Sequence, residues 1–238
     1  AGHLALGVGK SSGATITLIP EEWGDREIRL QEVVDILVTS VVRRLAEDKP
    51  YGVAVVAEGV IEQMSKEDLA ELEDVPRDEH GHIRLSEIDF ARMLKREVSQ
   101  ELKKLGINLR VVSKDLGYEL RCADPIAFDI DYTRSLGEAA VEFLLKGGTD
   151  GTMTIQRNQM VPVPFVDMMD PETGRTEVRK VNLDSFTYRS AYKFMIRLKP
   201  EYADDHMLMA DMAAETNLKF EEFKKRYGYL LDTAPNPA

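Results

Sequence analysis

The 238-residue sequence is poor in three features that would direct its function. It has a single cysteine, Cys122, which excludes an internal disulfide and fits a reducing cytoplasm. No apolar run approaches the length of a membrane span, and no signal peptide is visible. Basic residues do not predominate. The net charge of −11 argues against nucleic-acid and membrane partners, because both need a basic surface.

The composition is that of a globular protein, with 43% hydrophobic and 31% charged residues. This length can bury a full core as one large domain or two small ones. An anionic substrate is compatible with the acidic balance, since a pocket needs only a few local cations. The four histidines lack metal-ligand spacing, so we expect no metal ligands in this chain.

Apolar patterning predicts strands that alternate with helices. Largely apolar runs followed by Pro20 and Glu58 are typical of buried parallel strands. Between these two runs, apolar residues repeat at three- and four-residue steps, and this spacing indicates a helix. The expected elements are strands at 14–19, 52–57 and 108–112, a helix at 28–45, a short helix at 65–73, and a helix from Ser86 to Leu105 closed by Gly106.

The second half of the sequence predicts further helices and a hairpin. A helix is expected to start at Tyr132 or Thr133 and to end at Gly147. Short strands are expected at 152–157 and 160–165, an exposed hairpin or flap with its turn at 170–174, and helices at 185–198, 203–216 and 218–229. We therefore predict an α/β fold with a doubly wound, mainly parallel sheet and C-terminal helices.

A chemically distinctive segment runs from Gly117 to Arg121. The guanidinium of Arg121 presents a planar fork of donors that matches a phosphate or carboxylate, and Tyr118 adds a neutral donor. Ligands bind outside the carboxyl ends of the strands in a doubly wound sheet, which places Glu58, Tyr118 and Arg121 on one rim. From spacing alone, an exposed strand end with an ordinary surface arginine is an open alternative.

Three blocks of this sequence resemble phosphofructokinases, in particular the branch that uses pyrophosphate or either donor. Gly117-Tyr118-Glu119-x-Arg121, followed by Pro125, Phe128-Asp129, Tyr132 and Leu136-Gly137, resembles the fructose 6-phosphate-binding segment. Gly2–Leu6 continuing to Ile19–Glu22, and Val53 to Gly59, resemble two further blocks in the same order. The resemblance extends from Ala1 to about Arg197.

The resemblance implies roles for five residues that bind the sugar phosphate. Glu58 would accept hydrogen bonds from fructose hydroxyls, Tyr118 would donate to the 6-phosphate, and Arg121 would neutralise phosphate charge, often across a subunit boundary. Glu119 and Leu120 belong to the same segment. If the chain is extended there, at most one of these two faces the ligand.

The resemblance also implies what this chain leaves to other residues. In the family, the donor loop, the catalytic aspartate and the Met-Gly-Arg segment come before the point that matches Ala1. We therefore expect a C-terminal portion with no catalytic base, completed by a missing N-terminal half that also binds most of the Mg²⁺. A homo-oligomer is implied. The expected division is 1–127 for sugar-phosphate binding, 128–183 as a crossover that joins the missing half, and 184–238 as a helical segment.

Departures from the ATP-using bacterial pattern bear on the phosphoryl donor. Tyr118 replaces a histidine, Cys122 and Ala123 replace a glycine pair, and Ile130 stands where a second arginine is expected. These differences favour transfer of phosphate from pyrophosphate to the 1-hydroxyl of fructose 6-phosphate. Two alternatives stay open: an ATP-dependent 6-phosphofructokinase, and a non-catalytic sugar-phosphate-binding or regulatory subunit.

Overall fold

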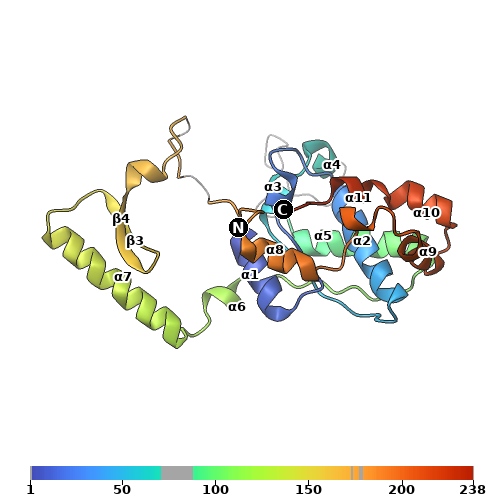
Figure 1. The fold of residues 1–238 in the computed structure, drawn as a ribbon, viewed down its shortest axis with the longest axis horizontal. Helices are drawn as coiled ribbons and strands as arrows, with labels where there is room; N and C mark the ends of the chain where they lie inside the picture. The colour runs from blue at the N-terminus through green and yellow to red at the C-terminus, as the bar shows by residue number, and fades with distance from the viewer. Residues whose placement is uncertain (1, 71–87, 173, 177–178, 238) are drawn as a thin grey trace. The chain divides into compact units, whose positions relative to one another are not determined.

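The computed structural model describes residues 2–70, 88–172, 174–176 and 179–237, with only the backbone described at 70 and 121 (Figure 1). The chain divides into two compact units. The first combines Ala1–Lys114 with Lys180–Ala238, and the second is Asp115–Arg179. The three-segment division expected from the sequence stays a prediction.

A two-stranded parallel sheet lies in the first unit. Strand β1 (Ile16–Leu18) pairs with β2 (Ala54–Val56), with Ile16 opposite Ala54 and Leu18 opposite Val56. Strand β1 is buried along its whole length, whereas Ala54 is exposed. Two strands were therefore predicted in the right places, but the predicted burial of the second was wrong. The reason is that β2 has no neighbour on its outer edge within the described ranges.

Three long helices surround this sheet. They are α1 (Gly2–Ser12), α2 (Leu30–Ala46) and α5 (Phe90–Lys104). Gly13 follows α1 and Gly106 follows α5, both with positive φ, a conformation that glycine adopts without strain. The side chain of Asp89 caps α5 by accepting from the amide of Arg92. The predicted start of this helix at Ser86 lies outside the described residues.

Two short helices follow β2. They are α3 (Gly59–Glu62) and α4 (Lys66–Ala70), and a parallel bridge between Ile28 and Met64 joins this region to the start of α2. The strand predicted at 108–112 was wrong: this stretch forms no strand, although Leu109 and Val111 pack against the core. A strand needs a partner as well as apolar residues, and the structure pairs none with this stretch.

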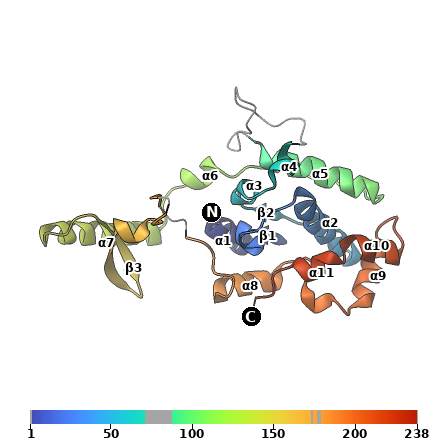
Figure 2. The same cartoon turned by 90° about the horizontal axis from the view of Figure 1, so that it is seen from above.

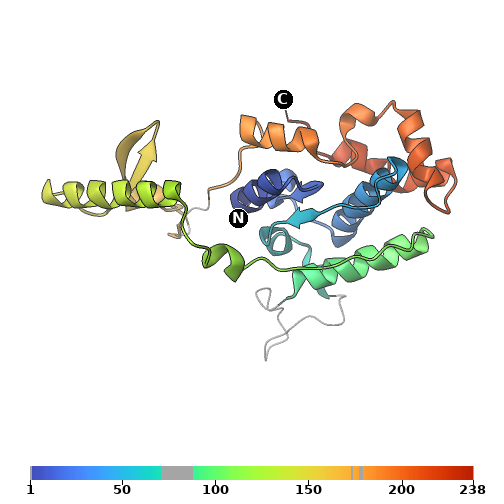
Figure 3. The same cartoon turned by 90° about the horizontal axis from the view of Figure 1, so that it is seen from below.

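The C-terminal helices are part of the first unit's core. They are α8 (Phe186–Phe194), α9 (His206–Ala214), α10 (Phe220–Tyr227) and α11 (Tyr229–Thr233), with the short 3₁₀ helix η4 (Pro200–Tyr202) after α8. Tyr188, Tyr192 and Met195 are all buried. Figures 2 and 3 show β1 and β2 between α5 on one side and α8 on the other.

The second unit contains the helix α6 (Tyr118–Arg121), the long helix α7 (Ala127–Leu145), the strands β3 (Gly151–Gln156) and β4 (Gln159–Pro164), and the 3₁₀ helix η3 (Phe165–Met168). Both strands were predicted, and the structure pairs them as an antiparallel hairpin. Arg157 and Asn158 both have positive φ, which is the geometry of a tight hairpin turn. Helix α7 begins five residues before Tyr132, so its predicted start was wrong.

Burial differs sharply between the two units. The first contains a continuous core that includes Leu18, Val38, Leu102, Tyr188 and Phe223. In the second unit no described residue is fully buried. The doubly wound sheet is not confirmed, because the parallel pairing in the described residues is limited to β1 and β2. Across the same residues, no helix combines the length and apolarity that a membrane crossing requires.

Candidate functional site

Acidic side chains gather where the two parallel strands end. Glu21 and Glu22 follow β1 within the 3₁₀ helix η1 (Pro20–Trp23), and Glu58 follows β2 at the start of α3. Pro20 stops β1 because it has no N–H for the ladder. Parallel strands end at one edge of a sheet, so these carboxylates share the rim at which such sheets bind ligands.

Glu58 is the carboxylate that is available to a ligand at this rim. Its side chain is exposed and makes no hydrogen bond or ion pair with the part of the chain that the structure describes. It occupies the N-cap position of α3, and its side chain makes no capping hydrogen bond to the helix. Such a carboxylate can accept hydrogen bonds from sugar hydroxyls. Its role as a sugar contact stays a prediction.

The segment predicted to bind phosphate forms one helical turn. Residues 118–121 make α6, so the expectation of an extended chain, from which opposite directions for Glu119 and Leu120 followed, was wrong. Tyr118 is 76% exposed, and the carboxylate of Glu119 accepts from the amide of Gly117 at 3.2 Å. That bond favours the turn in place of a strand. Arg121 ends α6, and only its backbone is described.

The predicted site residues are divided between the two units. Glu58 lies in the first, whereas Tyr118, Glu119, Leu120 and Arg121 lie in the second. Their convergence on one ligand therefore stays a prediction.

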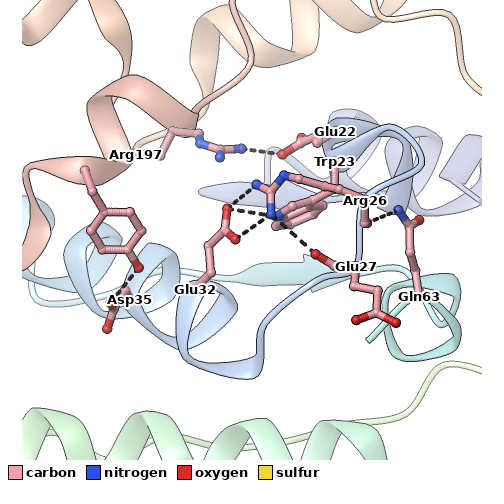
Figure 4. A network of polar contacts seen from close by, with 9 residues as sticks. Glu22, Trp23, Arg26, Glu27, Glu32, Asp35, Gln63 and Arg197 are labelled. Carbon is pink, nitrogen blue, oxygen red and sulfur yellow. Dashed lines mark hydrogen bonds and ion pairs between the residues drawn. The ribbon is translucent and has the colours of Figure 1, made fainter. Parts of the chain in front are cut away.

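A buried ion pair beside the rim was missed by the sequence analysis. The guanidinium of Arg197 donates to Glu22 at 2.6 Å, and their side chains are 3% and 1% exposed (Figure 4). The hydroxyl of Tyr188 donates to the other oxygen of Glu22 at 2.9 Å. Burial raises the pKa of Glu22, and the Arg197 guanidinium opposes this rise. The one available signal was an arginine between the apolar residues Ile196 and Leu198.

A second polar cluster fixes the loop between β1 and α2. Arg26 donates two hydrogen bonds to the carboxylate of Glu32, at 2.7 and 2.9 Å, and the indole N–H of Trp23 donates to the same carboxylate at 2.9 Å (Figure 4). Glu32 lies in the first turn of α2, where negative charge is favoured. The side-chain amide of Gln63 donates to the carbonyls of Gly24 and Arg26, at 2.7 Å each. This loop is therefore held by a side chain of α2, Glu32, and by Gln63, which follows α3.

Among the described residues of the rim, the Glu58 carboxylate can accept hydrogen bonds from a ligand. Glu22 and Glu32 are neutralised by arginines, and Glu58 is open. A phosphate needs cationic donors, and the sequence offers Arg121 for that purpose. Among the described residues, no three His, Cys, Asp or Glu side chains cluster in a way that could hold a metal ion.

No family model matches the sequence. It is 44% identical over 95% of its length to the pyrophosphate–fructose 6-phosphate 1-phosphotransferase of Thermotoga maritima, and 40% identical over 97% of its length to the protein of that name from Naegleria fowleri. Subunit beta 2 of the corresponding Arabidopsis thaliana enzyme is 28% identical over 68% of the chain and is covered over 36% of its own length. The chain spans about half the length of the first two, 55% of each.

Proposed function

We propose that this chain, which is homologous over almost its whole length to proteins named pyrophosphate–fructose 6-phosphate 1-phosphotransferase, supplies the fructose 6-phosphate-binding half of such an enzyme. The observation that carries this proposal is the identity of 44% and 40% over at least 95% of the chain. An open carboxylate at the rim of a parallel sheet supports it, because that is where α/β folds bind small ligands.

The proposed reaction transfers one phosphoryl group. The 1-hydroxyl oxygen of fructose 6-phosphate forms a bond to a phosphorus of pyrophosphate, the bridging P–O bond breaks, phosphate leaves, and the hydroxyl proton passes to a base. Catalysis of this kind depends on positioning and on neutralisation of charge. Glu58 orients the sugar through its hydroxyls. Tyr118 and Arg121 hold the 6-phosphate, and Glu119 and Leu120 shape the turn that presents them.

The remaining functions belong to the half that this chain does not contain. The base, the pyrophosphate loop and the ligands of Mg²⁺ are proposed to lie there. Further strands would extend the sheet beyond the open edge of β2 and complete a doubly wound fold. A homo-oligomer and a cytoplasmic location belong to the same proposal and stay predictions.

The apolar outer side of α7 supports the existence of a joining surface. Ile130, Gly137, Val141 and Leu144 recur at steps of seven, four and three residues, and all four are exposed. The opposite side of the helix, with Leu136 and other half-buried residues, is the one that packs on the hairpin.

These four residues, which we call the α7 stripe, leave the helix apolar on two sides. An exposed apolar stripe of this kind marks an interaction surface. We propose that the N-terminal half covers it.

The proposal is tested in the complete enzyme, meaning this chain joined to the N-terminal half that its relatives have. We expect Glu58→Gln to raise the KM for fructose 6-phosphate about tenfold or more and to leave the KM for pyrophosphate unchanged. Arg121→Ala is expected to lower kcat/KM by about 30-fold to several thousandfold, which corresponds to roughly 2–5 kcal/mol. Steady-state kinetics with each substrate varied would measure both.

The matched control is Glu62→Gln, an exposed carboxylate four residues after Glu58. It should leave both KM values unchanged. Equal effects of Glu58→Gln and Glu62→Gln would overturn the assignment of Glu58. Turnover with ATP and none with pyrophosphate would show that ATP, and not pyrophosphate, is the phosphoryl donor. Binding of fructose 6-phosphate without turnover from either donor would favour a non-catalytic subunit.

A further inference from the structure

No side chain fixes the direction of Glu58, so its placement depends on the backbone that carries it. The carboxylate is exposed and contacts no described polar group. At the start of this segment, the amide of Ala57 donates to the carbonyl of Leu18 on β1 at 2.9 Å. Val60 and Ile61 are 0% and 3% exposed and anchor α3 in the core. Helix α3 is a single turn, so its orientation also depends on how its far end is held.

The far end of α3 is held by Gln63. The side-chain amide of Gln63 donates to two main-chain carbonyls, those of Gly24 and Arg26. The main-chain carbonyl of Gln63 accepts from the amide of Ile28 at 3.0 Å. Figure 4 shows the side chain reaching toward the loop that carries Arg26. Both N–H donors of the amide are therefore in use. Gln63 therefore has no free donor to offer a substrate, and its two hydrogen bonds tie the end of α3 to the loop after β1.

The loop that accepts the hydrogen bonds of Gln63 is itself held by further contacts. Arg26 is tied to Glu32 by two hydrogen bonds, and Gly24 has a positive φ that fixes the turn after η1. The amide of Ser65 donates to the carbonyl of Ile28 at 2.9 Å and continues the attachment beyond Gln63. The segment that begins with Glu58 is thus attached to the sheet at its start and, through Gln63, to the loop that follows β1 at its end.

We propose that Gln63 is a positioning residue that sets the direction of the Glu58 carboxylate toward the fructose hydroxyls. The inference rests on the proposed function and deepens it, since it names the residue on which the geometry of the sugar contact depends. A side chain held about 1 Å out of place can cost a large part of a binding contact, even when the contact residue itself is intact.

The first test replaces Gln63 with methionine in the complete enzyme. Methionine has a similar length and cannot donate. We expect the KM for fructose 6-phosphate to rise about tenfold, with kcat changed less than about twofold and the KM for pyrophosphate unchanged. Lys66→Met, an exposed change three residues away, is the control and should alter none of these constants. Equal losses in kcat and in the KM of both substrates would indicate a merely structural role and would overturn the inference.

The second test replaces Gln63 with glutamate, which keeps the shape but faces two carbonyls without a proton to donate. As the pH falls from about 7 to about 5 the carboxyl group begins to protonate and regains one donor. The affinity for fructose 6-phosphate, relative to that of the unchanged enzyme at each pH, should then recover in Gln63→Glu and stay low in Gln63→Met. Calorimetric titration measures both. A constant deficit in Gln63→Glu across this range would contradict the proposed role.

A double-variant cycle separates this inference from the proposed function. If Gln63 acts through Glu58, then Gln63→Met should raise the KM for the sugar less than about twofold when Glu58→Gln is already present. Additive effects would overturn the inference and leave the role of Glu58 intact. If Glu58→Gln alone has no effect, the proposed sugar contact fails first, and Gln63 then has nothing to position.

Discussion

At the scale of single residues, the pairing of Glu22 with Arg197 is the costliest arrangement to disturb. Two charges that are almost fully buried, with a phenol donating to one of them, are stable only together. Glu21, next in the chain, uses one oxygen to accept from the amide of Val181 at 3.0 Å. Two adjacent carboxylates thus connect the end of β1 to the chain before α8, to α8 itself and to the chain that follows it.

We expect Arg197→Met to lower the free energy of unfolding by about 3–5 kcal/mol, because Glu22 is then buried without its counterion. Lys180→Met, which removes the exposed ion pair with Asp25, should cost less than about 1 kcal/mol. Urea unfolding monitored by circular dichroism compares the two. The double variant Glu22→Leu with Arg197→Met should recover much of the loss. A cost for Arg197→Met no larger than that of the control would show that the pair contributes little.

At the scale of elements, a buried carboxylate joins α2 to the C-terminal helices. The hydroxyl of Tyr229, at the start of α11, donates to Asp35 at 2.7 Å, and Gln31 donates to its other oxygen at 2.7 Å. Burial raises the pKa of Asp35, and the hydrogen bonds from Tyr229 and Gln31 oppose this rise. A raised pKa in the folded state means that the fold favours the protonated acid.

This shift predicts a pH dependence of stability. The folded state binds more protons than the unfolded state between the ordinary pKa of 3.8 and the raised value. The free energy of unfolding that Asp35 contributes should therefore be greatest below pH 3.8 and fall as the pH rises through the raised pKa. Asp35→Asn, which does not titrate, should flatten this decline. Denaturant titrations at several pH values measure the difference from the unchanged chain.

The exposed residue Asp25 provides the control for this measurement. Its side chain is 94% exposed, so Asp25→Asn should leave the decline in stability in place. A decline that is equally steep in Asp35→Asn would exclude Asp35 as its source. Glu22 has a pKa raised in the same direction, so the comparison between matched variants isolates the contribution of Asp35.

The same scale shows how far the sequence could be interpreted. The helices α2 and α5 and the strands β1, β2, β3 and β4 were predicted because period and glycine signals act locally. The prediction of a strand at 108–112 was wrong because a strand forms only when another strand pairs with it. Of the candidate site, the sequence correctly placed Glu58 just after a strand, but it could not reveal Gln63 or the Glu22–Arg197 pair. These contacts join residues that are 37 to 175 positions apart, and no local pattern encodes them.

At the scale of the whole molecule, the two units differ in whether their own buried residues can stabilise them. The first has a continuous core, and the second has no fully buried residue within the described ranges. Helix α7 buries no residue in 19, although apolar side chains line two of its sides. Conformational entropy opposes the ordering of such a helix unless further apolar area is buried. The proposed N-terminal half supplies that area on the α7 stripe.

We therefore expect Leu144→Asp to abolish association with a separately produced N-terminal half, since a charge in an apolar contact costs far more than one in water. Because Leu144 is 64% exposed in this chain, the same change should alter the chain's own stability by less than about 0.5 kcal/mol. Glu138→Lys, exposed on α7 outside the stripe, should leave association intact. Analytical ultracentrifugation of the mixed halves, with turnover from pyrophosphate as a second readout, tests this. Association that survives Leu144→Asp would mean that the joining surface lies elsewhere.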